Sequence, residues 1–255
     1  GPGDEVITSP VSAAYSALAI MMAGARPVFA DIDPERLTVD PAAVAAAVTP
    51  RTAAILPVHL YGQPADMPSI AAVAARHNLA IVEDACQAHM ATCRGQPVGR
   101  VGAGGAYSIY RAKNPGAPGA AAAYSFYPTK NLGALGDGGA ITFADAGLAG
   151  RARRLRNGGQ TDRYHHGEFG VNSRLDEMQA AVLRTRLRYL PGWTERRRAL
   201  AREYRRALQG ATVIVVPPEF DPGHVYHLFP VLSDRREEVR TALSSAGIDT
   251  LVHYP

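Results

Sequence analysis

The sequence has few cysteines, no long apolar run and only a small excess of positive charge. Two cysteines among 255 residues leave no disulfide framework, argue against a zinc or other metal site, and fit a reducing cytoplasm. The absence of any run of about 18 apolar residues argues against a membrane-spanning helix. The net charge is +4, and the basic residues gather in 151–159 and 194–206. We interpret these segments as solvated helix faces, so neither a membrane nor a nucleic acid is an expected partner.

Short apolar runs alternate with alanine-rich helical stretches over the first half of the chain. The sequence predicts strands within 6–10, 25–33, 52–62 and 78–85, with helices within 12–24, 40–48 and 67–77. Asp40-Pro41 is typical of a helix N-cap followed by proline at the first helical position, and Gly24 is typical of a helix stop. The alternation predicts an α/β domain with a mostly parallel sheet covered on both faces.

The pattern changes after residue 172. A long helical pattern covers 172–208 and is broken near Pro191-Gly192. Strand-like segments follow at 212–216 and 224–232, and then a helical segment at 236–247. We therefore predict a large domain over residues 1–190 and the start of a smaller α+β domain over residues 191–255.

An internal repeat lies within about 103–136. AYSIYRAKNPGAPG at 106–119 matches AYSFYPTKNLGALG at 123–136 in nine of fourteen positions, with a constant offset of 17 residues. Each copy has a serine followed five residues later by a lysine, Lys113 or Lys130. Two copies cannot occupy one place in a sheet, and surface loops accept extra length at little cost. We expect one copy in the sheet and the other in a loop.

Three segments contain candidate functional residues. In IVEDACQAH, Asp84 follows an apolar run at the carboxyl end of a predicted parallel strand, the edge where ligands bind in open α/β sheets. The alternative is an aspartate that caps the next helix. In NSRLDEMQAA, Asn172 and Arg174 precede a helix, where they bind an anion or simply cap the helix.

The third segment, AYSFYPTKNLGALGDGGAI, holds Lys130 in a glycine-rich turn after a predicted strand, with Ser125 and Thr129 as hydroxyl donors to a phosphate. Taken alone, the segment favours a surface turn with a solvated lysine. Together, an aspartate at a strand end and a hydroxyl-rich lysine turn are what pyridoxal phosphate chemistry requires. The carboxylate keeps the pyridine nitrogen protonated, and the lysine forms a Schiff base and then moves the proton.

At this point the sequence resembles a known family. GPGDEVI, AGARPVFADID, VHLYGQPADM, EDACQAH, SFYPTKNLGALGDGGAI, NSRLDEMQAAVL and VYHLFPV occur in the order typical of the DegT/DnrJ/EryC1/StrS sugar aminotransferases. The resemblance covers nearly the whole chain. It implies the aspartate-aminotransferase fold (fold type I), pyridoxal 5'-phosphate as cofactor and a homodimer. It also implies transfer of an amino group from glutamate to a keto sugar, usually nucleotide-linked.

The resemblance assigns five residues to the cofactor. It implies that Lys130 is the Schiff-base lysine and that Asp84 is the partner of the pyridine nitrogen. Gln87 matches the residue near the phenolic oxygen, and Ser125 matches a phosphate ligand. Asn172 matches the residue that reaches the phosphate of the neighbouring subunit.

Three histidines match positions near the substrate. These are His89, His227 and His253, although structural roles are equally open for the last two. The motifs are more similar to those of the sugar 3-aminotransferases than to those of the 4-aminotransferases or aminocyclitol enzymes. We therefore expect a nucleotide-linked 3-keto-6-deoxyhexose as acceptor. A sister branch of sugar dehydratases has histidine in place of the lysine, and Lys130 argues against it.

The chain also departs from the family pattern. The family has several dozen further residues before GPGDEVI and a longer small domain, so the resemblance implies a piece of a longer protein. Ser12 fits the pattern as a cofactor-binding residue, whereas Ala13 stands where the family often has an aromatic residue, with Tyr15 nearby. Met90 stands where glycine is common, which is costly if the backbone there has positive φ. These departures leave a second hypothesis, a catalytically inactive or regulatory paralogue.

Overall fold

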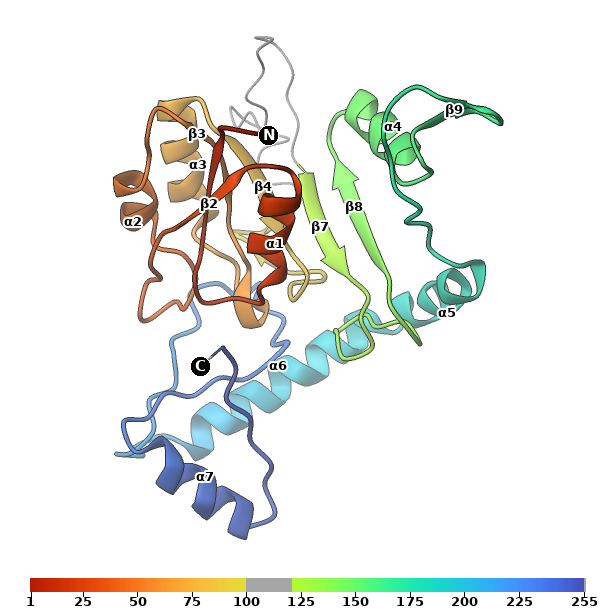
Figure 1. The fold of residues 1–255 in the computed structure, drawn as a ribbon. Helices are drawn as coiled ribbons and strands as arrows, with labels where there is room; N and C mark the ends of the chain where they lie inside the picture. The colour runs from red at the N-terminus through yellow and green to blue at the C-terminus, as the bar shows by residue number, and fades with distance from the viewer. Residues whose placement is uncertain (100–120, 255) are drawn as a thin grey trace.

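A six-stranded sheet forms the centre of the computed structural model, which describes residues 1–99 and 121–254 (Figure 1). Its strands are β1 (Glu5–Thr8), β2 (Arg26–Phe29), β3 (Thr52–Leu56), β4 (Ala80–Asp84), β7 (Ala121–Ser125) and β8 (Gly139–Phe143). The order is β2-β1-β3-β4-β7-β8, and only β8 is antiparallel to its neighbour among these strands. The mostly parallel sheet predicted from the sequence is confirmed.

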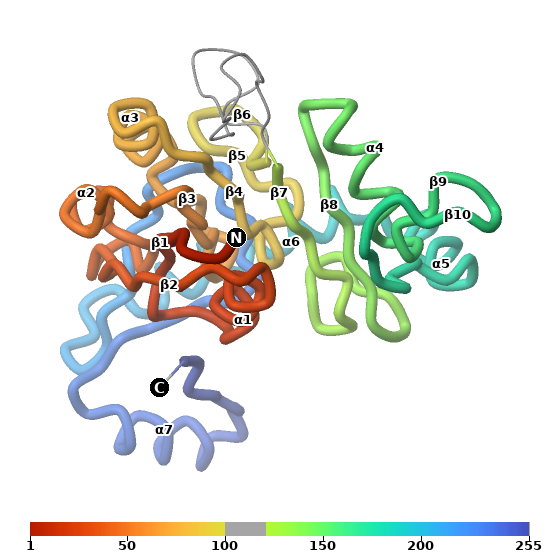
Figure 2. Tube along the Cα trace, turned by 45° about the horizontal axis from the view of Figure 1, so that its top comes forward, coloured from red at the N-terminus to blue at the C-terminus, as the bar shows by residue number. Residues whose placement is uncertain are grey.

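Helices cover both faces of this sheet. They are α1 (Tyr15–Met22) on one face, and α2 (Pro41–Ala46) and α3 (Met67–His77) on the other (Figure 2). This division follows from right-handed crossovers, because β1 to β2 runs toward one edge of the sheet and β2 to β3 runs back. Asp40 accepts a hydrogen bond from Ala42 N–H and Pro41 lies in the first turn of α2, as predicted. Gly24 has φ +76° just after α1, also as predicted.

The main core lies between the sheet and the pair α2 and α3. Its fully buried side chains include Ile7, Ile55 and Ile81 from the strands, with Val44 and Ile70 from the helices. The parallel strands end at the lower edge of the sheet in Figure 1, which faces α6. The order reverses between β1 and β3, so this edge is where an open α/β sheet binds its ligand.

Four helices occur in the described chain after β8. They are α4 (Ala146–Leu155), α5 (Glu177–Leu187), α6 (Leu190–Ala207) and α7 (Arg236–Ser245). Short elements complete the description: β5 (Thr92–Cys93), β6 (Gln96–Pro97), β9 (Gln160–Asp162), β10 (His165–His166) and a 3-10 turn at Leu60–Gly62. No helix in the described ranges is long and apolar enough to cross a membrane.

The break predicted near Pro191-Gly192 is confirmed: α5 ends at Leu187 and α6 begins at Leu190, with Pro191 in its first turn, where the missing N–H costs nothing. The predicted strands at 212–216 and 224–232 are wrong, since only Val215 and Leu232 form a bridge. In the segment at 224–232, the N–H groups of Val225 and Leu228 instead donate to the carbonyls of Gly62 and Tyr61. The boundary near residue 190 stays a prediction.

The second copy of the repeat supplies β7. Val82, Glu83 and Asp84 pair in parallel with Ala121, Ala122 and Ala123, and the chain returns through a turn into β8. The expectation that one copy joins the sheet is therefore confirmed for the copy at 123–136. The copy at 106–119, with Lys113, lies outside the described residues.

Candidate active site

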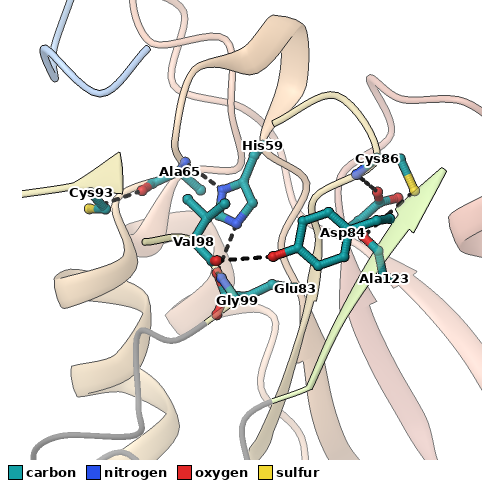
Figure 3. Close-up of polar contacts among 10 residues, drawn as sticks. His59, Ala65, Glu83, Asp84, Cys86, Cys93, Val98, Gly99 and Ala123 are labelled. Carbon is teal, nitrogen blue, oxygen red and sulfur yellow. Dashed lines mark hydrogen bonds and ion pairs between the residues drawn. The ribbon is translucent and has the colours of Figure 1, made fainter. Parts of the chain in front are cut away.

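Asp84 is the last residue of β4 and its carboxylate is held at both oxygens. Ser16 Oγ donates to Oδ2 at 2.7 Å, and Cys86 N–H donates to Oδ1 at 3.0 Å (Figure 3 shows the second contact). Ser16 is buried and comes from α1, 68 residues earlier in the chain. The sequence indicated Asp84 from its strand-end position, but no local signal pointed to Ser16 as its partner.

Gln87 lies three residues further along and both ends of its amide are fixed. Tyr61 N–H donates to Oε1 at 2.6 Å, and Nε2 donates to the hydroxyl of Tyr254 at 2.7 Å. The rings of the two tyrosines are 6.2 Å apart. Burial is the main reason that the pKa of Tyr254 is raised, and the nearby negative charge of Asp84 adds to it. Tyr254 is therefore bonded to the amide of Gln87, a contact that the sequence did not indicate.

Lys130 lies in the turn between β7 and β8. Its N–H donates to Tyr127 O at 2.9 Å, and Ala134 N–H donates to Phe126 O at 2.7 Å. Gly133 packs directly on the carbonyl of Pro128, where a Cβ would overlap it. Ser125 Oγ accepts from Tyr127 N–H at 3.2 Å, so the hydroxyl stands at the start of the same turn. The turn is thus fixed by its own backbone, as the glycine-rich pattern predicted.

A buried histidine, His89, and a half-buried one, His227, lie near Lys130. His89 is 4% exposed between the rings of Tyr124 and Phe126, and neither of its ring nitrogens has a hydrogen-bond partner in the described structure. Burial, and then the positive charge of Lys130, lowers the pKa of His89 to about 4. The same two causes, in the same order, lower the pKa of His227 to about 3. Both rings are therefore neutral near pH 7.

His227 is held by the lysine turn and by α6. Its Nδ1–H donates to Asn131 Oδ1 at 3.1 Å, while Asn131 Nδ2 donates to Val225 O at 3.1 Å. Arg197 on α6 donates to the carbonyl of His227 at 3.3 Å. The asparagine that follows Lys130 thus ties the lysine turn to the histidine. His253 is exposed, and its charge also contributes to the lowered pKa of His227.

One predicted residue, Asn172, lies apart from this group. Asn172 is exposed and bridges to Asn157 just after α4, which lies beyond β8 from the rest of the site (Figure 1). Ser12 is half-buried between β1 and α1. Tyr15, the aromatic residue nearest in sequence to Ala13, is 80% exposed.

The thiol and the backbone near Asp84 complete the description. Cys86 is half-buried, and burial followed by the charge of Asp84 raises the pKa of its thiol, so it stays protonated. Met90 has φ +66°, the left-handed conformation for which glycine is preferred. In the described ranges no group of three or more His, Cys, Asp or Glu side chains could hold a metal ion.

The chain is similar to proteins of known structure. At 50% identity it resembles an enzyme of Streptomyces venezuelae named dTDP-3-amino-3,4,6-trideoxy-alpha-D-glucose transaminase, covering 100% of this chain and 63% of the relative. The crystal structure of S. venezuelae DesV in complex with a ketimine intermediate superposes with a TM-score of 0.89, over 100% of this chain and 64% of that one. Bacillus subtilis NtdA with bound PMP gives a TM-score of 0.85 at 33% identity, covering 100% of this chain and 56% of NtdA.

The chain thus spans less than two thirds of the length of each of these proteins. The likeness nevertheless extends from the first residue of the chain to the last. The model of the DegT/DnrJ/EryC1/StrS aminotransferase family matches residues 1–255. The aspartate-aminotransferase-like fold expected from the sequence is confirmed, since the similar structures are aminotransferases. The chain belongs to the DegT/DnrJ/EryC1/StrS aminotransferase family.

Proposed function

We propose that the full-length protein is a pyridoxal-phosphate-dependent aminotransferase. It moves an amino group from glutamate to a keto sugar, a nucleotide-linked 3-keto-6-deoxyhexose. The observation that carries this proposal is the convergence of Asp84, Gln87 and Lys130 at the carboxyl edge of the sheet, beside the neutral histidines His89 and His227. The sugar class is supported by the name of the 50%-identical relative, a dTDP-amino-sugar transaminase.

The residues at this edge fit pyridoxal phosphate. We assign Asp84 to the pyridine nitrogen, Gln87 to the phenolic oxygen, Ser125 and Ser12 to the phosphate side, and Lys130 to the aldehyde carbon. A carboxylate acceptor, amide and hydroxyl donors and an amine nucleophile are the groups that these atoms require. The two unpartnered nitrogens of buried His89 support a polar ligand at the same place, because buried polar groups normally have partners.

The cofactor, when bound, supplies the electron sink for a carbanion next to the transferred nitrogen. The chain's own residues do the rest. Asp84, oriented by Ser16 and by Cys86 N–H, keeps a proton on the ring nitrogen. Lys130 takes the proton from the substrate carbon and returns it. His227 and His253 belong to the segment that we predict to start the smaller domain. We assign them, together with His89, to hydrogen bonds with the sugar.

We further propose that two copies form the working unit. The exposed side of α1 carries Leu18, Met21 and Met22, with Met22 88% exposed. Phe169 and Val171, three residues and one residue before Asn172, are also exposed. Apolar side chains exposed in this way mark interaction surfaces. A second copy covering them is consistent with Asn172 acting on the phosphate of the neighbouring subunit rather than on its own.

The two free thiols, Cys86 and Cys93, fit a reducing compartment, and we place the protein in the cytoplasm. The proposed activity is tested on the full-length protein. Pyridoxal phosphate is added, absorbance is followed, and borohydride then fixes the cofactor to the lysine that holds it. Peptide mapping is expected to find the label on Lys130. The Lys130→Ala variant should lose the absorbance change, and Lys113→Ala, in the matched repeat, should keep it.

Glutamate-dependent amination of nucleotide-linked 3-keto sugars completes the test. Labelling at Lys113 would overturn the assignment of the lysine. Cofactor binding without turnover of any keto sugar would favour the inactive or regulatory paralogue, and turnover of aminocyclitol precursors alone would favour that branch of the family. No absorbance change at all would refute the proposed function.

A further inference from the structure

The loop between β3 and α3 contacts both residues that we assign to the cofactor ring. Its sequence is PVHLYGQPA, residues 57–65, a motif to which neither spacing nor resemblance gave a role. His59 N–H donates to Asp84 O at 3.0 Å, and Asp84 N–H donates to Pro57 O at 2.9 Å. The N–H of Tyr61 donates to Gln87 Oε1 at 2.6 Å. One loop therefore sets the backbone of the aspartate and the side-chain orientation of the glutamine.

The conformation of this loop is uncommon. Tyr61 has φ +59° and Gly62 has φ +91°, so two consecutive residues lie in the left-handed half of the map. A tyrosine in that conformation is costly and persists only where the surroundings fix it. The loop needs an anchor other than its own backbone preference.

The side chain of His59 is that anchor. It is fully buried, and its Nδ1 accepts a hydrogen bond from Ala65 N–H at 3.1 Å, which closes the loop on itself. Because Nδ1 accepts, the ring proton is on Nε2, which donates to Glu83 Oε2 at 2.9 Å (Figure 3). Glu83 is also fully buried, and the same oxygen accepts Gly99 N–H at 2.7 Å.

Glu83 and Asp84 are consecutive in β4, so their side chains point to opposite faces of the sheet. The buried pair therefore cannot touch the cofactor, and its effect passes through the loop. The loop also contacts the segment at 225–228. Val225 N–H donates to Gly62 O at 3.1 Å, Leu228 N–H donates to Tyr61 O at 3.3 Å, and a Cβ at Gly62 would stand 2.9 Å from the backbone nitrogen of His227.

We propose that His59 and Glu83 form a positioning pair that fixes the 57–65 loop and thereby aims Gln87 and Asp84 at the cofactor ring. The inference rests on the proposed function, since it needs a ring at that place. It predicts that loss of the pair loosens the contacts of Gln87 and Asp84 with the ring.

The variants are made in the full-length protein. Glu83→Leu removes the acceptor for both His59 and Gly99, whereas Glu83→Gln keeps it, because one oxygen accepts both bonds. His59→Asn retains an acceptor for Ala65 N–H and loses the bond to Glu83, and it carries the test if Glu83→Leu does not fold. Glu5→Leu is the matched control. Glu5 is an equally buried glutamate, at the opposite end of the sheet.

Two quantities are measured beside the melting temperature. They are the Kd for pyridoxal phosphate from an absorbance titration, and the pH midpoint of the absorbance change of the bound cofactor. In Glu83→Leu and His59→Asn we expect the Kd to rise on the order of tenfold, as when an outer partner of a ligand-holding residue is removed, and the midpoint to move. Glu83→Gln should match the wild type, and Glu5→Leu should lower only the melting temperature.

An unchanged Kd and midpoint in both variants that lose the pair would overturn the inference. Equal changes in Glu5→Leu would also overturn it, since the effect would then follow stability alone. A wild-type protein that does not bind pyridoxal phosphate refutes the proposed function instead, so the two failures are distinguishable.

Discussion

The buried histidine His89 should make the cofactor-free protein sensitive to mild acid. Its pKa is about 4 in the folded chain against an ordinary value of 6.5, because burial and the charge of Lys130 oppose protonation. The unfolded chain therefore binds a proton as the pH falls below about 6.5, while the folded chain does not until about pH 4. A histidine whose pKa is lowered in the folded state favours the unfolded state throughout that window, so the free energy of unfolding falls as the pH falls.

The size of the effect follows from linkage. Between about pH 7 and about pH 5, one such histidine removes about 2 kcal/mol from the free energy of unfolding. His227, with a pKa of about 3 from the same causes, adds a loss of similar size. Domain stabilities are commonly about 5–15 kcal/mol, so this loss is readily measured by urea unfolding at the two pH values.

The decisive variant is His89→Leu. Leucine fills the buried position of His89 and removes the titratable group. We expect the difference in unfolding free energy between about pH 7 and about pH 5 to shrink by about 2 kcal/mol relative to the wild type. His77→Gln, at an exposed position of α3, should leave that difference unchanged. An identical pH dependence in His89→Leu and wild type would refute the reasoning.

Three further changes test the surroundings of the site. Ser16→Ala removes a donor from Asp84 and should lower the unfolding free energy by about 1–2 kcal/mol and weaken cofactor binding in a titration, whereas Ser16→Thr should restore both. Gly62→Ala should lower the melting temperature more than Gly95→Ala, because both positions have positive φ but only Gly62 has backbone within 3 Å of the added Cβ. Met90→Gly should raise the unfolding free energy by about 1 kcal/mol, since it relieves the strain of φ +66°.

Local patterns predicted the parts of the site that depend on neighbouring residues. Asp84 could be placed because an acidic residue directly after an apolar run ends a buried strand, and β4 does end there. The Lys130 turn could be placed because its glycines and proline specify a tight path, and Gly133 does lie against Pro128. In both cases the signal and the structure lie within a few residues of each other.

Contacts between distant segments left no such signal. Ser16 reaches Asp84 only because β1 and β4 both lie beside β3, which places α1 next to the end of β4. The strand prediction at 224–232 failed for a related reason. The apolar alternation is present, but the N–H groups of Val225 and Leu228 donate to the 57–65 loop. They are therefore not available for hydrogen bonds to a neighbouring strand. Periodicity indicates which face of a segment is buried, not which partner buries it.

The repeat shows how packing decides between two nearly equal sequences. Leu132 is buried with Ala134, Leu183 and Leu190, so the lysine turn is anchored on α5 and α6 as well as by its backbone. The first copy has Pro115 at the position of Leu132. A copy without that leucine loses most of the free energy gained by burying a large apolar side chain, which is about 1.5–3 kcal/mol. The edge of β4 opposite β3 accepts a single strand, so a difference of this size gives the place beside Asp84 to the copy that carries Lys130.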